Sequence, residues 1–417
     1  MITNPKKLMA IYNSNAATVA NSLAAAQYYA MARNLDPAHI QGYDLGEAAN
    51  ISGATNRDAF RAGALTQIRD YIINNSIEAV LLSIGCPAHM DTVDGTGTSS
   101  KSLCRVIGDA PRVLAGVATT GPACGKPNRQ ATVYGRGGSA AIHKSWTQVR
   151  MRIGNTDTSG YGYDYRTVPD STSFGASKQT PCGRLGYHNG DPTTDSLALA
   201  QRCVDDAIWF EQNGNPADEP FLFGFADRSA LLEQGNIWDA WQQLHEHVGI
   251  AHVYDGDYLN AANTKHAAQN WSWELPEVTI LNQAAWLMGG GPNIELWGWL
   301  GAGFNNNDNA YLPSVSFKRG GWMFESTSSF VSKYAIPAGA CAAIGPIGEP
   351  YPPGLPEIGG LVYFLLRNFS LEEATVATMS YNGNADQCEV CGDPYYSPLN
   401  KIRYSKTGGM SAGGDGA

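Results

Sequence analysis

Residues 8–33 read LMAIYNSNAATVANSLAAAQYYAMAR. The short apolar run at 8–12 predicts a buried β-strand. The polar side chains of Asn13, Ser14 and Asn15 then provide a turn with helix-capping chemistry. From there, apolar residues recur at helical spacing and predict a helix over residues 16–33.

The same alternation continues after this helix. Apolar runs predict strands at 40–45 and 79–84, and between them a helix opens at Asp58. Strand, helix, strand, helix and strand in this order are typical of a right-handed, doubly wound sheet. Residues 1–90 are therefore predicted to form a Rossmann-like α/β unit.

The rest of the chain divides by composition. Residues 91–194 are dense in Gly, Ser, Thr and Pro and predict a loop-rich insertion. Strand and helix patterns resume at Thr194 and predict a second α/β unit over 195–400, followed by a Gly-rich tail at 401–417. The expected fold class is α/β: two linked Rossmann-like parallel sheets, flanked by helices, with an irregular insertion. The patterns predict helices at 197–214, 230–248, 358–366 and 371–379, and strands at 221–225, 251–254, 278–288, 295–300 and 340–344.

Charge and hydropathy restrict the partners. The net charge is −10 and no run of Lys and Arg occurs, so binding to nucleic acid is not expected. No apolar stretch approaches the roughly 20 residues that a membrane span requires. Lys6 and Lys7 precede only a short apolar run, so no signal peptide is visible. We expect the chain to be made in the cytosol and to remain there or to enter a virion.

Eight cysteines are present in the chain. Without a secretion signal, buried free thiols are the expected state. Cys104, Cys124 and Cys182 lie in loop-like sequence and are the first candidates if disulfides form. Cys388 and Cys391 form a C-x-x-C near the C-terminus, which also predicts buried thiols or a pair at a strand edge.

Several groups of polar residues are candidates for a functional site. Cys86 and His89 follow the third predicted strand, with Asp91 nearby, and are the fallback candidates for a nucleophile and its base. Two other groups could line one binding pocket at the carboxyl edge of the sheet or form rigid turns: Asn307 and Asp308, and Glu349 and Tyr351.

No metal or cofactor is expected. His245 and His247 are two apart on a predicted helix and point in different directions, which makes chelation poor. The glycines at 289–291 match neither a dinucleotide-binding fingerprint nor a phosphate-binding loop.

Several segments together resemble a family of uncharacterised bacterial and phage proteins. The resemblance starts with Asn13-Ser14-Asn15 and continues through Gly183-Arg184-Leu185-Gly186 and Glu325-Ser326-Thr327-Ser328. It ends with Gly348-Glu349-Pro350-Tyr351 and the motif G-D-P-x-Y-x-P at residues 392–398. The resemblance implies no established activity.

That family is more remotely similar to the gingipain-type cysteine peptidases, which have a caspase-like fold. The resemblance implies that the parallel sheets, and the unit over 195–400 in particular, are caspase-like (gingipain-like). In those enzymes one strand ends in Gly-His-Gly and the next ends in the nucleophilic Cys. The comparable place here is Gly301-Ala302-Gly303, with Ser316 or Phe317 at the expected end of the next strand, 312–317. No Cys or His lies between Ala267 and Ala340. Alanine cannot act as a base, so the resemblance predicts that the catalytic dyad is absent.

These observations predict a non-catalytic structural or assembly protein built on a degenerate peptidase-like fold. The low charged fraction of 16%, with many Tyr, Trp and Asn residues, favours a self-assembling homo-oligomer such as a phage tail component. Its partners would be copies of itself and other assembly proteins. Two alternatives remain open: a cysteine-peptidase-like hydrolase using Cys86, and a surface protein that binds a glycan or peptide through Trp271, Trp273, Trp297 and Trp299.

Overall fold

A computed structural model describes the parts of the chain on which the following account of the fold rests. These are residues 5–90, 101–108, 110–114, 180–187, 192–225, 244, 253–255, 279–280, 294–302, 315–325, 332–347, 356, 358–366, 368–378 and 388–399.

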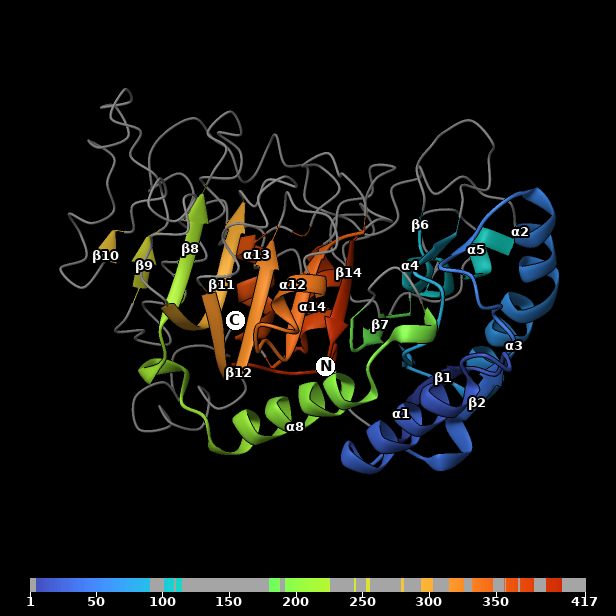
Figure 1. The fold of residues 1–417 in the computed structure, drawn as a ribbon, viewed down its shortest axis with the longest axis horizontal. Coiled ribbons are helices and arrows are strands. Elements are labelled where there is room, and N and C mark those ends of the chain that lie inside the picture. The colour runs from blue at the N-terminus through green and yellow to red at the C-terminus, as the bar shows by residue number, and fades with distance from the viewer. Residues whose placement is uncertain are drawn as a thin grey trace, which may run out of the picture.

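The described strands build one large, mostly parallel sheet rather than the two sheets expected (Figure 1). It consists of two parallel blocks, which meet where β13 pairs antiparallel with β14. The N-terminal block contains, from the edge inward, β2 (Ile40–Tyr43), β1 (Leu8–Asn13), β4 (Ala79–Leu82), β7 (Cys182–Leu185) and β14 (Cys388–Gly392). The C-terminal block continues with β13 (Ala342–Pro346), β12 (Val315–Glu325), β11 (Ile294–Ala302), β8 (Phe221–Phe225), β9 (Val253–Asp255) and β10 (Thr279–Ile280).

Each block has a strand order known from doubly wound folds. Numbered along the chain within its block, the C-terminal block has the order 3-2-1-4-5-6 and the N-terminal block has the order 2-1-3-4-5. The fifth strand of the N-terminal block is β14, which comes from the far end of the chain. The N-terminal block is therefore completed only by residues beyond 387.

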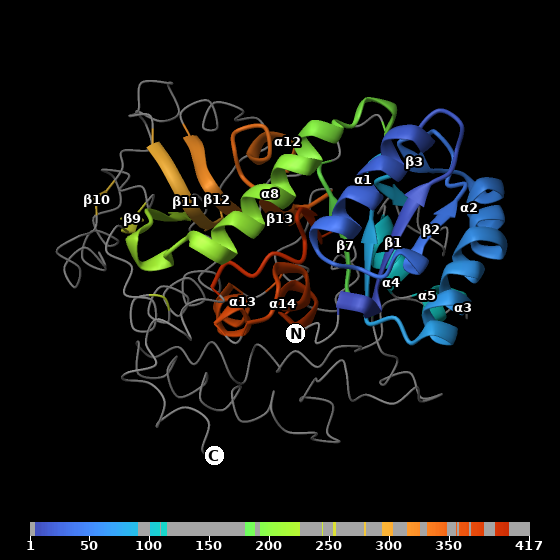
Figure 2. The ribbon, with the colours of Figure 1, turned by 90° about the horizontal axis from the view of Figure 1, so that it is seen from below.

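Helices cover both faces of the sheet (Figure 2). In the N-terminal block, Leu8 and Ala10 of β1 face α1 (Val19–Ala32) and α8 (Leu197–Asn213), while Met9 and Ile11 face the opposite helices. This alternation is the period of two that a strand covered on both faces requires. The remaining helices are α2 (Ala54–Phe60), a π-helical segment (Arg61–Leu65), α3 (Thr66–Asn75), α4 (Leu103–Gly108), α5 (Ala110–Leu114), α12 (Ser332–Ala335), α13 (Ile358–Leu365) and α14 (Leu371–Thr378).

Smaller elements complete the described structure. A second sheet contains β3 (Asn50–Ile51), β5 (His89–Met90) and β6 (Lys101–Ser102). Short 3-10 turns lie at Pro5–Lys7, Pro37–His39, Pro192–Thr194 and Pro216–Asp218. Within the described residues, no helix is both long and apolar enough to cross a lipid bilayer.

Several element boundaries differ from those predicted. Helix α1 begins at Val19 rather than residue 16, because Thr18 N–H donates to the Asn15 carbonyl and closes a turn first. Helix α2 begins at Ala54 rather than Asp58. Strand β12 runs on to Glu325, whereas the sequence placed its end at 317. Within the predicted insertion 91–194, the residues of β7 form a strand of the main sheet.

Candidate functional site

The positions that the peptidase resemblance assigns to the catalytic dyad are the carboxyl ends of β11 and β12. Strand β11 ends at Ala302, as predicted. In β12, Ser316 pairs with Glu295 near the start of both strands, so its placement at the strand's carboxyl end was wrong. A shift of register after Leu296 lengthens β12, and Glu325 pairs with Gly301 at the carboxyl end instead. Neither position provides a thiol or an imidazole.

The tryptophans of β11 do not form a glycan-binding surface. Trp297 and Trp299 are both buried, and Trp297 packs among Phe210, Phe221 and Trp322 in the core of the sheet. Trp271 and Trp273, the other two aromatic candidates, lie outside the described residues.

Cys86 is a poor nucleophile in this structure. Its side chain is fully buried, and burial raises the pKa of the thiol to about 12, so the thiol stays protonated at neutral pH. Its carbonyl accepts a hydrogen bond from Arg184 Nη1 at 2.9 Å, which fixes the loop after β4. His89 lies half-buried in β5, paired in register with Asn50 and Ser102. Asp91 lies outside the described residues.

The candidate pocket residues Asn307, Asp308, Glu349 and Tyr351 also lie outside the described residues. Cys388 and Cys391 are buried in β14, a central strand rather than an edge strand. Within the described ranges, no three His, Cys, Asp or Glu side chains are arranged to hold a metal ion.

The carboxyl end of β1 lies beside the switch point of the strand order, where doubly wound sheets often bind ligands. Here the Asn13 side chain binds the backbone of the surrounding loops. Asn13 Nδ2 donates to the carbonyls of Gly46 and Gly85, at 2.6 and 2.7 Å. Asn13 Oδ1 accepts from the backbone N–H groups of Leu45 and Asn15. Asn13 thus ties three loops together instead of capping α1, the role that the sequence suggested.

In the described residues, a set of buried hydrogen bonds and ion pairs lies at the boundary between the two blocks. There the motif residues 392–397 form what we name the C-terminal turn. Gly392 N–H donates to the Gly186 carbonyl at 2.6 Å, in the N-terminal block, and Asp393 N–H donates to the Cys341 carbonyl at 2.8 Å, in the C-terminal block. The backbone of the turn is therefore bonded to both blocks.

Two consecutive tyrosines of the C-terminal turn reach in opposite directions. Tyr395 Oη donates to the carbonyl of Val80 at 2.5 Å and lies 3.1 Å from that of Pro181, both in the N-terminal block. Tyr396 Oη donates to the Gly320 carbonyl of β12 at 2.8 Å. Both rings are buried, so each hydroxyl replaces its lost hydration with a bond to the backbone.

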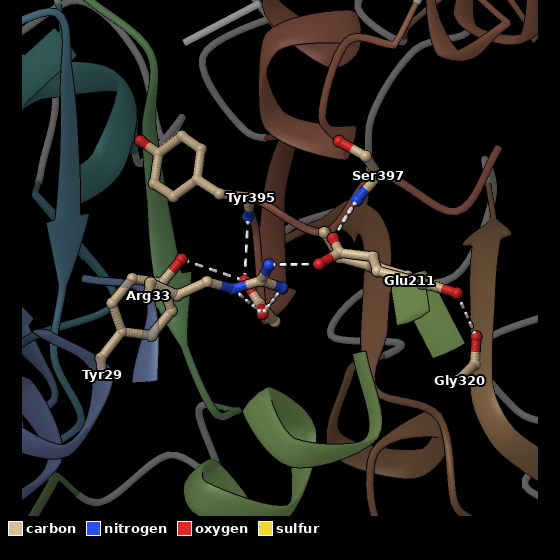
Figure 3. A network of polar contacts seen from close by, with 8 residues as sticks. Tyr29, Arg33, Glu211, Gly320, Tyr395 and Ser397 are labelled. Carbon is tan, nitrogen blue, oxygen red and sulfur yellow. Dashed lines mark hydrogen bonds and ion pairs between the residues drawn. The ribbon is translucent and has the colours of Figure 1, made fainter. Parts of the chain in front are cut away.

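Asp393 is the centre of a charged network, and Figure 3 shows its partners Tyr29, Arg33 and Tyr395. Arg33, directly after α1, donates to Asp393 Oδ2 through Nε at 3.0 Å and through Nη2, while Tyr29 Oη donates to Oδ1 at 3.1 Å. The remaining Arg33 nitrogen, Nη1, binds Glu211 of α8, and Glu211 Oε1 accepts from Ser397 N–H at 2.9 Å. Burial raises the pKa of Glu211, although the Arg33 guanidinium partly offsets this.

Two further buried arginines of the N-terminal half pair with carboxylates from the end of the chain. Arg105 of α4 binds Glu372 of α14 through two hydrogen bonds, at 2.6 and 3.0 Å. Arg184 of β7 lies 3.5 Å from Glu389 of β14. Together with Arg33 and Asp393, three cations from the first half of the fold meet three anions that follow residue 371.

A pocket of about 300 Å³ opens beside this network. Tyr29, Arg33, Glu211, Tyr395 and Ser397 line it, together with apolar residues that include Leu8. Arg33 and Glu211 already bind each other, so these charges support the walls of the pocket.

The chain was compared with models of protein families, with curated proteins and with solved structures, and none of the three comparisons found a match. The sequence marked the motif at 392–398 only through its resemblance to a family. It missed Arg33, Arg105 and Arg184 as partners of the C-terminal carboxylates. The signal that could have revealed them is a lone arginine within an otherwise apolar element, as in Leu103–Gly108, because a buried cation needs a partner.

Proposed function

We propose that this chain is a non-catalytic structural or assembly protein, a phage virion component such as a tail protein, whose partners are copies of itself and other assembly proteins. The observation that supports the proposal most directly is that charged side chains inside the fold pair with one another. Arg33, Arg105 and Arg184 of the first half of the fold each form an ion pair with a carboxylate of the last segment of the chain.

The buried thiols also support a non-catalytic role. Cys86 and Cys203 have pKa values raised to about 12 by burial, and burial raises those of Cys182, Cys341 and Cys391 well above the ordinary value. A thiol peptidase needs a thiol whose pKa is lowered. We take the fold as a degenerate, caspase-like peptidase scaffold that is retained for assembly.

The composition supports the assembly role. Only 16% of the residues are charged, while Gly, Tyr and Trp are abundant. Aromatic side chains bury large areas at interfaces between subunits, and charged side chains are depleted there. A homo-oligomer or a regular array is therefore the expected product of purification.

The test combines electron microscopy with a chemical assay. We expect purified protein to form regular oligomers or tubes in negative-stain micrographs, and to be heavier than 44.6 kDa by light scattering. A monodisperse monomer at high concentration would contradict the assembly role.

The chemical assay asks whether any thiol is catalytic. In the reduced native protein, a chloroacetamide probe should label Cys86 no faster than Cys203, the matched control that is equally buried. Selective labelling of Cys86 that depends on pH and is lost in His89→Ala would favour the hydrolase instead. Turnover of a peptide substrate that is lost in Cys86→Ala would do the same.

A further inference from the structure

Two of the buried cysteines lie close to the two ends of residues 109–179, which connect α4 with β7 in the chain. The two ends of this segment are held together by the backbone, since Thr180 N–H donates to the Gly108 carbonyl at 2.9 Å. Cys104 lies in α4, before this segment, and Cys182 is the first residue of β7, after it.

A shared carboxylate fixes these two positions against each other. Glu372 Oε1 accepts from Arg105 Nη1 at 2.6 Å and from Cys182 N–H at 2.9 Å. Arg105 is the neighbour of Cys104 in the chain, so one oxygen atom binds both the guanidinium of the residue next to Cys104 and the backbone N–H of Cys182. Both thiols are fully buried in the same apolar cluster, and the pKa of the Cys182 thiol is raised first by burial and then by the neighbouring Cys104 thiol.

We propose that Cys104 and Cys182 form a disulfide when the chain folds in an oxidising environment, and that this bond fastens the base of the segment between them. The oxidant is a low-molecular-weight disulfide such as oxidised glutathione. The thiolate of one cysteine attacks it to form a mixed disulfide and releases one glutathione thiol. The second cysteine then displaces the other glutathione, so two protein thiols lose two protons and two electrons, and two glutathione thiols are formed.

Burial determines when the bond forms. In the folded, reduced protein the raised pKa of Cys182 leaves almost no thiolate, and a bulky oxidant cannot reach either sulfur. We therefore expect fast oxidation during folding and slow oxidation afterwards. This order does not depend on whether the protein assembles.

The test refolds the full chain from the reduced, denatured state with reduced and oxidised glutathione. Remaining thiols are blocked with iodoacetamide in denaturant before digestion and mass spectrometry. The expected product is a peptide pair joined through Cys104 and Cys182. Recovery of both cysteines as alkylated thiols would overturn the proposal, as would pairing of either one with Cys124 or Cys388.

A thermal measurement provides a second readout. The refolded, oxidised protein should lose on the order of 5 °C in Tm when a reductant is added, because the bond closes a long loop. Cys104→Ala should abolish this dependence on reductant, whereas the control Cys203→Ala should keep it. If Cys104→Ala fails to fold, the peptide analysis of the unaltered protein still decides the question. A Tm unaffected by reductant in the unaltered protein would contradict the proposal.

Discussion

Arg105 and Glu372 show what a single buried ion pair does in this protein. Their side chains are 1% and 0% exposed. Removing the carboxylate charge leaves a guanidinium in a medium of low dielectric constant without its partner. We predict that Glu372→Gln lowers the free energy of unfolding in urea by about 3–5 kcal/mol.

The exposed pair Arg69 and Asp70 provides the matched control, with 31% and 52% of the side chains exposed. Asp70→Asn should change the stability by less than about 1 kcal/mol, because water screens this pair. Equal losses in Glu372→Gln and Asp70→Asn would show that the buried pair has no special role.

The ionisation of a single side chain, Glu211, makes the stability of the fold depend on pH. Burial raises the pKa of Glu211 in the folded state. Between the unfolded and the folded pKa values the native state binds more protons, so its stability falls as pH rises through this window. The contribution of Glu211 is therefore complete below the unfolded pKa and is lost above the folded one.

Glu211→Gln cannot titrate and so isolates this effect. As the pH is lowered through the window, we expect the unfolding free energy of the unaltered protein to rise relative to that of the variant. Urea titrations at a series of pH values measure the difference. A relative fall in the same window would mean that the Arg33 interaction, rather than burial, dominates the pKa of Glu211.

At the scale of elements, the tight junction between β14 and the C-terminal turn requires glycine. Gly392 has a φ of +95°, and a Cβ there would lie 2.2 Å from the Cys341 carbonyl oxygen. Gly46 has a φ of +78° but open space around it. Gly392→Ala should therefore destabilise the protein by at least about 2 kcal/mol more than Gly46→Ala, which suffers only backbone strain. Thermal denaturation of both variants decides this, and equal Tm losses would refute the steric argument.

The observed strands and helices show which parts of the fold could be predicted from the sequence. Local patterns predicted β1, β8 and α8 nearly to the residue, because these elements carry uninterrupted apolar runs or a clear helical period. The strand β14 was missed because its residues, CEVCG, contain a charged Glu389, whose pairing with Arg184 depends on tertiary contacts. The one continuous sheet was missed for a related reason, since no local signal shows that β14 returns to β7. That no Cys or His lies between Ala267 and Ala340 can be read from the sequence alone.

At the scale of the whole molecule, β14 makes the two blocks interdependent. It pairs with β13 over five residues and with β7 over two. Glu389 within β14 and Asp393 directly after it form ion pairs with Arg184 and Arg33 of the N-terminal block. Separation of the blocks would break backbone pairing and leave buried cations without partners at the same time. Neither block should therefore persist when the other unfolds.

Two probes that report on different blocks test this. Trp297, Trp299 and Trp322 are buried in β11 and β12, so tryptophan fluorescence reports on the C-terminal block. Reactivity of Cys86, buried beside β4, follows the N-terminal block. We predict that both signals change at the same urea concentration in the reduced protein, because unfolding is cooperative across β14. Transitions at separate urea concentrations would show that the blocks are independent domains and that the ion pairs at their boundary contribute little to holding them together.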